Sequence, residues 1–204
     1  MSIESDNIIG LYRRHAQTWA RRRTPAQPWT AHKWMDVFLG IVPDTKRILD
    51  IGCGTGDPIA RYFIDQGCSV TGIDASPEML EIAQARFPRS TWINADMRSL
   101  DLEQKFDGIL AWHSSFHLTP EDQRGLFPIF EKHAAPGAAL MFTSGTGHGV
   151  AMGEFEGEPL YHASLAPDEF RALLDQHGFE VVDFVVEDPD CGGSTNWLAK
   201  YRAN

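Results

Sequence analysis

The segment Arg47-Ile48-Leu49-Asp50-Ile51-Gly52-Cys53-Gly54-Thr55-Gly56-Asp57-Pro58 decides how the rest of the chain is interpreted. It begins with a short apolar run rich in β-branched residues, which is typical of a buried strand. The alternate glycines that follow let the backbone turn sharply and approach a ligand closely. Asp57 as N-cap and Pro58 as first helical residue then predict a helix start. The segment therefore predicts a strand, a ligand-binding turn and a helix.

The same alternation of strand and helix continues along the chain. Ser76-Pro77-Glu78 and Thr119-Pro120-Glu121 each combine a capping residue, a proline and an acid, so they predict two more helix starts. This alternation favours a parallel sheet that is covered on both faces and wound with right-handed crossovers. The predicted strands are 47–51, 69–73, 91–93, 106–112 and 138–143, and the predicted helices are 58–66, 76–87 and 119–133.

The two ends of the chain have a different character. Apolar residues recur at helical spacing over about 7–39, with a break at Thr24-Pro25-Ala26-Gln27-Pro28. These helices either cover the sheet or close as a lid over the ligand, and the sequence leaves both alternatives open. Residues 145–159 are rich in Gly and Glu and predict a long loop. The predicted elements after it are a helix over 167–177 and an antiparallel pair of edge strands, 179–186 and 195–201.

Charge and cysteine content exclude several classes of protein. The net charge of −10 disfavours nucleic acid as a partner, because phosphate contacts require a basic surface. For the local cluster of arginines over 13–23, a solvated helix face is the favoured interpretation and a site for one anion is the alternative. The scattered Cys53, Cys68 and Cys191 indicate neither a disulfide framework nor a zinc site. The lack of a signal-like N-terminus and of a membrane-length apolar run predicts a cytoplasmic protein without a membrane partner.

Acidic residues follow consecutive predicted strands. Asp50 ends the first strand, Asp74 ends the second and Asp96 follows the third. In an open parallel sheet, ligands bind beyond these carboxyl ends. An acid at the end of the second strand can accept hydrogen bonds from both hydroxyls of a ribose. The pattern therefore indicates a nucleoside site.

The glycine spacing separates two classes of nucleoside-binding protein. A dinucleotide site requires Gly-x-Gly-x-x-Gly, whereas the third glycine here, Gly56, comes one residue early. Asp57 stands in the later place, where its charge would repel a pyrophosphate. The spacing favours a nucleoside without phosphate.

On these residues, the segment from Ile48 to about Phe142 resembles a class I S-adenosylmethionine-dependent methyltransferase of the small-molecule type. The resemblance rests on the glycine turn, on the acid within 72–80, on Asp96-Met97 and on 106–110. It implies an α/β fold: a doubly wound, mostly parallel seven-stranded sheet with an antiparallel C-terminal strand and an N-terminal helical cover. We expect one domain over 1–204, with a helical lid (1–44), a cofactor-binding core (45–144) and a substrate loop with C-terminal strands (145–204).

The resemblance also implies roles for individual residues. The glycine turn would pass the methionine part of S-adenosylmethionine, Asp74 would bind the ribose, and Asp96 would accept from the adenine amino group. Asp50 would either contact the cofactor or hold the turn. Without the resemblance, Asp96 could cap a turn, Met97 could fill the core and Trp112 could simply be buried. The expected cofactor-binding residues are Asp50, Gly52, Cys53, Gly54, Gly56, Asp74, Ala75, Met79, Asp96, Met97, Trp112, Tyr12 and Arg23, the last as a partner for the methionine carboxylate.

Candidate residues for the chemistry follow the fourth strand. His113 and His117 lie where the methyl group should project, and either could act as a base. A structural role remains the alternative for each, and metal binding is disfavoured because no Glu follows His113 and no third ligand is evident. Tyr161 and His162, after the Gly/Glu-rich segment, are candidates for substrate contact.

The sequence therefore predicts an enzyme that transfers a methyl group from S-adenosylmethionine to an O, N or S atom of a small molecule. The acidic charge and the absence of an Asn/Asp-Pro-Pro-Tyr/Phe sequence after the fourth strand favour a small acceptor over nucleic acid. The alternatives are a catalytically silent cofactor-binding module and a nicotinamide-dependent oxidoreductase. Oligomeric state is not predicted.

Overall fold

The computed structural model of the protein describes residues 3–23 and 29–202. The helix break predicted at 24–28 lies outside the described residues.

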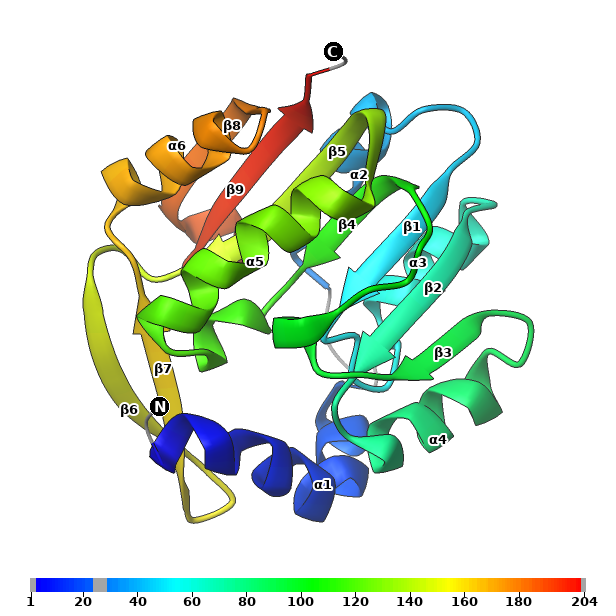
Figure 1. The fold of residues 1–204 in the computed structure, drawn as a ribbon. Coiled ribbons are helices and arrows are strands. Elements are labelled where there is room, and N and C mark those ends of the chain that lie inside the picture. Colours follow the sequence, from blue (N-terminus) through cyan, green and yellow to red (C-terminus); the bar gives the residue numbers. More distant parts are fainter. Residues whose placement is uncertain (1–2, 24–28, 203–204) are drawn as a thin grey trace.

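A seven-stranded sheet forms the centre of the protein, with the strand order β3-β2-β1-β4-β5-β9-β8 (Figure 1). Strands β1 to β5 pair in parallel, whereas β9 is antiparallel to both β5 and β8. The predicted fold class is therefore confirmed, including the antiparallel C-terminal strand. The strands are β1 (Arg47–Ile51), β2 (Ser69–Asp74), β3 (Thr91–Asn94), β4 (Phe106–Ala111), β5 (Ala134–Ser144), β8 (Phe179–Asp188) and β9 (Ser194–Tyr201).

Helices cover both faces of this sheet (Figure 1). On one face Phe38 of α2 packs against Phe63 of α3, with ring centroids 5.6 Å apart. On the other face Phe127 of α5 lies 6.2 Å from Phe170 of α6. The helices are α1 (Ile3–Arg23), α2 (His32–Ile41), α3 (Ile59–Asp65), α4 (Pro77–Arg86), α5 (Pro120–His133) and α6 (Pro167–Gln176), with short 3-10 turns η1 (Met97–Ser99), η2 (Ser115–His117) and η3 (Pro189–Cys191).

Two of the three predicted helix caps are confirmed. The side chain of Ser76 accepts a hydrogen bond from an N–H of α4, and the side chain of Thr119 does the same for α5. The prediction that Asp57 caps α3 is wrong, because the helix begins at Ile59 without a side-chain cap. The Asp57 carboxylate instead accepts two hydrogen bonds from the guanidinium of Arg61. This bidentate pair occupies the carboxylate oxygens that a cap would require.

The prediction of a long loop over 145–159 is also wrong. A two-stranded antiparallel hairpin occupies this region, formed by β6 (Gly149–Phe155) and β7 (Glu158–Ser164). Every residue of β6 except Phe155 is exposed, so the segment has no alternation of buried and exposed positions that would mark a strand. Strand β5 also begins at Ala134, before the predicted strand 138–143, and its first part is irregular.

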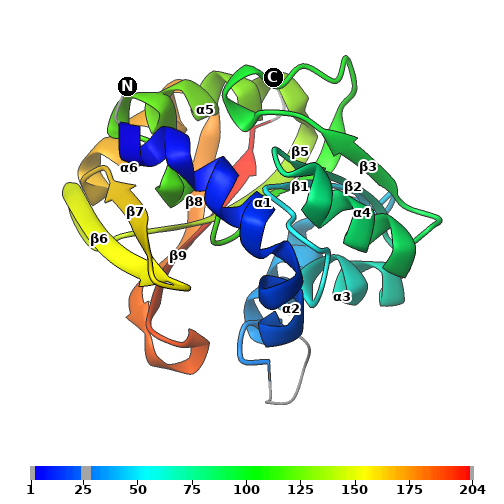
Figure 2. The ribbon, with the colours of Figure 1, turned by 90° about the horizontal axis from the view of Figure 1, so that it is seen from below.

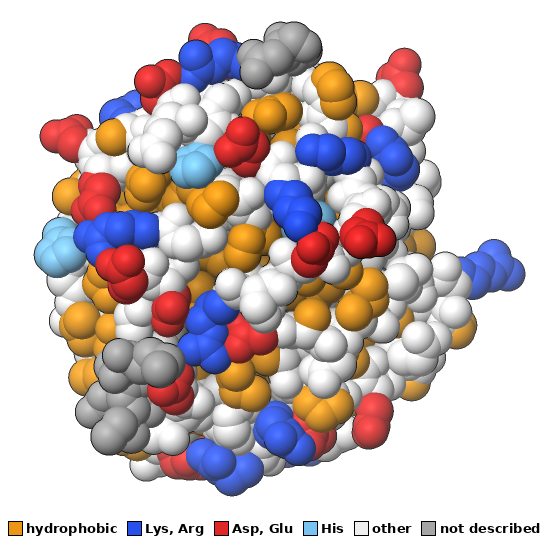
Figure 3. Space-filling view, viewed as in Figure 1, with side chains coloured by type: hydrophobic (Ala, Val, Ile, Leu, Met, Phe, Trp, Pro, Cys, Tyr) orange, Lys and Arg blue, Asp and Glu red, His pale blue; other side chains and the backbone are white. Residues whose placement is uncertain are grey.

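Helix α1 lies between this hairpin and α4 (Figure 2). It bends at His15, whose backbone is not helical. Its exposed arginines pair with acids on both neighbours: Arg13 contacts Glu78 at 3.1 Å, and Arg14 contacts Glu158 of β7. This part of the arginine cluster is therefore a paired face and not simply a solvated one. On the face shown in Figure 3, positive and negative side chains are interspersed.

Candidate active site

A cavity lies beyond the carboxyl ends of the central strands and beneath α1. Strand order reverses between β1 and β4, and such a reversal is where an open α/β sheet binds its ligand. Most of the residues singled out from the sequence line this cavity. They are Tyr12, Arg23, Asp50, Gly52, Cys53, Gly54, Asp74, Ala75, Met79, Asp96, Met97, Trp112, His113 and His117.

The glycine turn is held against the end of β2. The N–H groups of Gly52 and Cys53 both donate to the carbonyl of Ile73, at 2.8 and 3.0 Å. Gly52 has a φ of +76°, and a Cβ atom there would lie 2.4 Å from the Cβ of Ser114. Both the backbone conformation and the available space therefore require glycine at this position.

The third glycine of the turn has a different role. Gly56 is not among the residues that line the cavity. A Cβ at Gly56 would lie 2.9 Å from the ring of Trp92 and 3.1 Å from that of Phe87. Gly56 thus permits close packing of the turn against these two rings.

Asp74 combines a structural and a binding position. Its carboxylate accepts hydrogen bonds from the N–H of Gly54 at 2.9 Å and from that of Ser76 at 2.8 Å. A carboxylate can accept about four hydrogen bonds, so capacity remains for groups in the cavity. Burial raises the pKa of Asp74, and these backbone N–H groups oppose the rise.

Asp50 is a carboxylate that lacks a hydrogen-bond partner among the described residues. It is 3% exposed and lines the cavity. Burial, together with the nearby charge of Asp74, raises the pKa of Asp50 to about 7. The neighbouring thiol of Cys53 also has a raised pKa, because of burial and the charge of Asp50. This part of the cavity therefore suits a cation or another hydrogen-bond donor.

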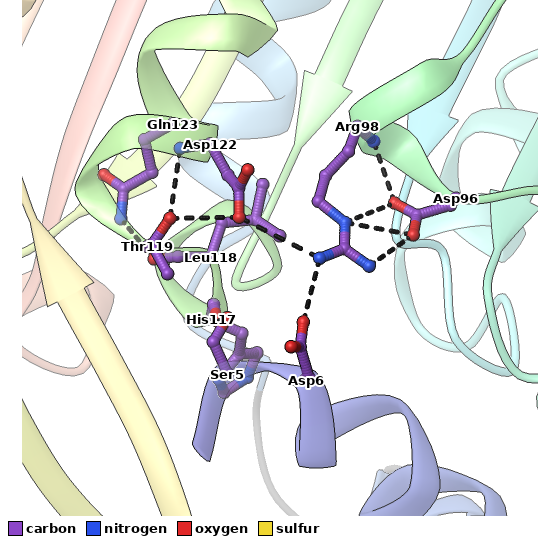
Figure 4. A network of polar contacts seen from close by, with 9 residues as sticks. All are labelled: Ser5, Asp6, Asp96, Arg98, His117, Leu118, Thr119, Asp122 and Gln123. Carbon is purple, nitrogen blue, oxygen red and sulfur yellow. Dashed lines mark hydrogen bonds and ion pairs between the residues drawn. The ribbon is translucent and has the colours of Figure 1, made fainter. Parts of the chain in front are cut away.

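The Asp96 carboxylate is held by Arg98 (Figure 4). It accepts from the backbone N–H of Arg98, which caps η1, and from the guanidinium at 2.6 Å. Burial would raise the pKa of Asp96, but the bonds from Arg98 outweigh it and the pKa is lowered. The same guanidinium reaches Asp6 of α1 at 3.1 Å and Asp122 of α5 at 3.9 Å. Asp96 therefore both caps a turn and lines the cavity.

His117 is bonded at both ring nitrogens. Its Nδ1 lies 2.8 Å from the carbonyl oxygen of Tyr161, and its Nε2 lies 2.9 Å from the hydroxyl of Tyr12. Its own carbonyl accepts from the hydroxyl of Ser5 in α1 at 2.9 Å (Figure 4). Burial lowers the pKa of His117 to about 4, so the ring is neutral near pH 7.

His113 occupies a strained backbone position beside the same cavity. Its φ is +51°, which is uncommon for a residue other than glycine, and its N–H donates to the hydroxyl of Thr143 at 2.9 Å. Burial, followed by the charge of Arg23, lowers the pKa of His113 to about 4. Backbone strain of this kind is concentrated at functional sites.

The two predicted substrate residues of the hairpin do not line the cavity. Tyr161 contributes its backbone carbonyl to His117. The ring of His162 lies 4.9 Å from that of His117 and 5.2 Å from that of Phe116. Both residues therefore stand behind His117.

Three arginines at the end of α1 have separate environments. Arg21 donates to the hydroxyl of Thr18, and Arg22 pairs with Glu156. Arg23 lines the cavity and lies 4.5 Å above the ring of Trp19. Within the described part of the chain, no carboxylate pairs with Arg23, and burial lowers its pKa. Arg23 is therefore a cation available to a ligand.

Two residues that matter to the site were missed in the sequence. Ser114 fills the space that Gly52 leaves and donates to the carbonyl of Ile51 at 2.7 Å. Arg98 holds Asp96, and its position two residues after an Asp that follows a strand could have suggested this pairing. No comparable local pattern marks Ser114.

Residues 3–23 and 29–202 contain no group of three or more His, Cys, Asp or Glu side chains that could hold a metal ion. Over the same ranges, no helix is long and apolar enough to cross a membrane.

The fold and the cavity define an α/β protein with a doubly wound sheet and a ligand-sized cavity at the reversal of strand order. Comparisons with known proteins narrow this class. Residues 48–137 match the family described as a methyltransferase domain. The chain is 28% identical over 166 residues to O-methyltransferase rstn1 of Aspergillus nomiae. The aligned region covers 74% of this chain and 72% of rstn1. It is 29% identical to dTDP-3-amino-3,4,6-trideoxy-alpha-D-glucopyranose N,N-dimethyltransferase of Streptomyces venezuelae, over 52% of this chain and 45% of that protein. Over residues 48–137 the chain is therefore similar to a methyltransferase domain, and the relatives it matches are named as methyltransferases.

A solved structure shows the same fold over nearly the whole chain. The structure is that of CalS10, an amino pentose methyltransferase of Micromonospora echinaspora with S-adenosylmethionine bound. It superposes with a TM-score of 0.70 at 21% identity, over 90% of this chain and 95% of CalS10. The chain spans 72% of rstn1 but less than half of the next curated relatives, 45% and 34% of their lengths.

Proposed function

We propose that this protein transfers a methyl group from S-adenosylmethionine to an N, O or S atom of a small molecule. The observation that carries the proposal is the cavity at the reversal of strand order. Asp74 and the glycine turn lie toward its β2 side, and Trp112, His113 and His117 follow β4. Relatives named as N- and O-methyltransferases support small-molecule methylation and leave the acceptor atom open.

The residues present fit the proposed cofactor. The amino-acid part of the proposed cofactor carries one ammonium group and one carboxylate. The cavity holds an acid, Asp50, and a cation, Arg23, and neither has an ion-pair partner among the described residues. Asp74 has acceptor capacity left for a ribose hydroxyl. Ala75 and Met79 would pack on the adenine. The capacity that Arg98 leaves on Asp96 would accept from the adenine amino group.

The cofactor, when bound, supplies a methyl group on a positively charged sulfur. The chain's own contribution is to orient the acceptor and to exclude water, which can supply most of the rate enhancement of an in-line displacement. Helix α1 covers the cavity and places Tyr12, Trp19 and Arg23 along it. A base among His113 and His117 is required only if the acceptor must lose a proton during transfer.

Calorimetry with S-adenosylhomocysteine and with NADH tests this function directly. We expect micromolar binding of the first and weaker or no binding of the second. Asp74→Ala should weaken binding of S-adenosylhomocysteine by about tenfold or more, because hydrogen bonds to a charged group are worth about 1.5–3 kcal/mol. Failure of the wild-type protein to bind S-adenosylhomocysteine would rule the proposal out. Turnover of labelled S-adenosylmethionine with a metabolite panel then separates an enzyme from a silent binding module.

A further inference from the structure

A chain of hydrogen bonds runs from the hairpin into the cavity. The carbonyl of Tyr161 in β7, the ring of His117 and the hydroxyl of Tyr12 in α1 are joined by contacts of 2.8 and 2.9 Å. His117 is 8% exposed, and both His117 and Tyr12 line the cavity. Three separate elements of the fold therefore fix the position of the Tyr12 oxygen.

The direction of each hydrogen bond follows from what the groups can donate. A carbonyl oxygen only accepts, so the proton on the His117 ring must sit on Nδ1. In the neutral ring Nε2 then carries a lone pair, and the Tyr12 hydroxyl must donate to it. Burial lowers the pKa of His117 and raises that of Tyr12, so both groups stay neutral near pH 7.

The Tyr12 oxygen is therefore left as an acceptor. Its proton is used by His117, and among the described residues no group donates a hydrogen bond to its lone pairs. A group that forms a hydrogen bond to this oxygen in the cavity must present an N–H or an O–H. The same chain leaves His117 without a free nitrogen to take a proton.

We infer that the methyl acceptor is a neutral amine that donates an N–H to the Tyr12 oxygen, and that His117 is a positioning residue that fixes the direction of that bond. The inference rests on the proposed methyl transfer and names its acceptor class. An amine can attack while keeping its proton, whereas an alcohol must lose one as it reacts. Burial, which sets the pKa of His113 near 4 as well, leaves that ring a weak base.

The transfer balances without a further reagent. The nitrogen lone pair forms the new N–C bond, and the C–S bond breaks with its electron pair moving to sulfur, which leaves S-adenosylhomocysteine. The product is an N-methylammonium ion, which then loses its proton to water. Tyr12 orients the attacking nitrogen and keeps its own proton throughout.

The tautomer of His117 can be measured without any acceptor. In protein labelled with nitrogen-15 histidine and saturated with S-adenosylhomocysteine, NMR should show a neutral ring protonated at Nδ1, assigned by its loss in His117→Gln. Tyr12→Phe should shift the Nε2 resonance, whereas Tyr201→Phe, which alters a tyrosine of β9 outside the cavity, should not. A ring protonated at Nε2 would overturn the inference.

Matched acceptors test the substrate class. Benzylamine, benzyl alcohol and benzyl mercaptan, and the three cyclohexylmethyl analogues, would be incubated with methyl-labelled S-adenosylmethionine. We expect label in the amines and not in the alcohols, with kcat/KM rising with pH as each amine loses its own proton. Transfer to the alcohols at rates comparable to the amines, or to none of the amines, contradicts the inference. If either outcome is found and the wild-type protein still binds S-adenosylhomocysteine, only the inference about the amine fails and the proposed methyl transfer stands.

Two variants separate positioning from general-base catalysis. Gln at position 117 can still accept the Tyr12 proton, whereas Phe cannot, so His117→Gln should retain several-fold more kcat/KM for the amine than His117→Phe. The pH profile of His117→Gln should keep its shape. The titratable and charged groups that act on Tyr12 and His117 are His113, His162, Arg23 and Asp74. Loss of an inflection in the acidic limb in His117→Gln would identify His117 as a base and overturn the positioning role.

Discussion

Asp6 of α1 and Arg98 of η1 form an ion pair, with Oδ1 and Nη1 3.1 Å apart, that ties the helix covering the cavity to the side of the cavity where Asp96 lies (Figure 4). The same guanidinium binds Asp96 at 2.6 Å. One side chain thus contacts both the cover and the wall of the cavity.

Removing this ion pair should loosen α1 without unfolding the protein. The Arg98 and Asp6 side chains are 27% and 46% exposed, and pairs of this kind are worth about 0.2–1 kcal/mol. Asp6→Asn should therefore speed dissociation of S-adenosylhomocysteine by about two- to fivefold, measured by stopped-flow displacement. Asp101→Asn breaks the comparably exposed pair with Lys132 and serves as the control. Equal dissociation rates in the two variants would show that Asp6 does not hold the cover.

Asp50 should make cofactor affinity depend on pH. With its pKa raised to about 7, Asp50 is protonated at lower pH and cannot pair with an ammonium group. Affinity for S-adenosylhomocysteine should therefore rise between pH about 5 and about 8, and Asp50→Asn should flatten the curve. The control ligand is 5′-methylthioadenosine, which lacks the amino-acid group and should show no such rise. The same rise for both ligands in calorimetry would contradict an ammonium contact.

The same carboxyl should affect the stability of the protein without ligand. Because folding raises the pKa of Asp50, the folded state binds its proton more tightly than the unfolded state. The resulting stabilisation is present below the ordinary Asp pKa of about 4 and is lost as the pH rises to about 7. Asp50→Asn should therefore be more stable relative to wild type at pH about 8 than at pH about 4, measured by urea unfolding. An unchanged difference would show that Asp50 is solvated.

Arg23 should recognise the carboxylate of the cofactor. Arg23→Met removes the guanidinium group, whose carbon lies 4.5 Å from the centre of the Trp19 ring, and keeps an unbranched apolar side chain. We expect the Kd for S-adenosylhomocysteine to rise by about 10- to 100-fold, since hydrogen bonds between charged groups are worth about 1.5–3 kcal/mol, while the Kd for 5′-methylthioadenosine stays within about twofold. Arg21→Met, which alters a neighbour bonded to Thr18, is the control. Equal losses for both ligands would assign Arg23 a structural role.

Glycine 52 should not tolerate a side chain. Its φ of +76° is unfavourable for alanine, and the new Cβ would lie 2.4 Å from that of Ser114. Gly52→Ala should lower the free energy of unfolding by at least about 1–3 kcal/mol, the cost of such a backbone conformation. Gly125→Ala, within α5 and with no atom within 4 Å of its Cβ, should instead stabilise the helix by about 0.5–1 kcal/mol. Similar changes in the two variants, measured by denaturant titration, would contradict this account.

Local sequence predicts those parts of the fold that depend on local chemistry. The glycine turn and the capping residues Ser76 and Thr119 each satisfy backbone requirements within a few positions, so their patterns were readable. The cap prediction fails at Asp57 because both oxygens of its carboxylate accept hydrogen bonds from Arg61. The hairpin was missed because β6 lies exposed along nearly all of its length.

The part of the site contributed by distant elements could be predicted only as a list of candidates. Tyr12, His113 and His117 stood out by residue type and by position on a helix or after a strand. Tyr12 contacts His117, 105 residues away in sequence, and His117 contacts the carbonyl of Tyr161, 44 residues away. Both contacts depend on how α1 and the hairpin pack against the rest of the fold. No local pattern encodes such contacts.

The position of α1 also sets an order of events during synthesis. This helix leaves the ribosome before the residues that it contacts, because Tyr12 meets a residue 105 positions later and Arg14 meets one 144 positions later. Such long-range contacts form slowly, because a large loop must close before they are gained. Strands β1 to β5 leave the ribosome before the hairpin does, so the cover of the cavity is completed only after most of the sheet-forming chain has been synthesised.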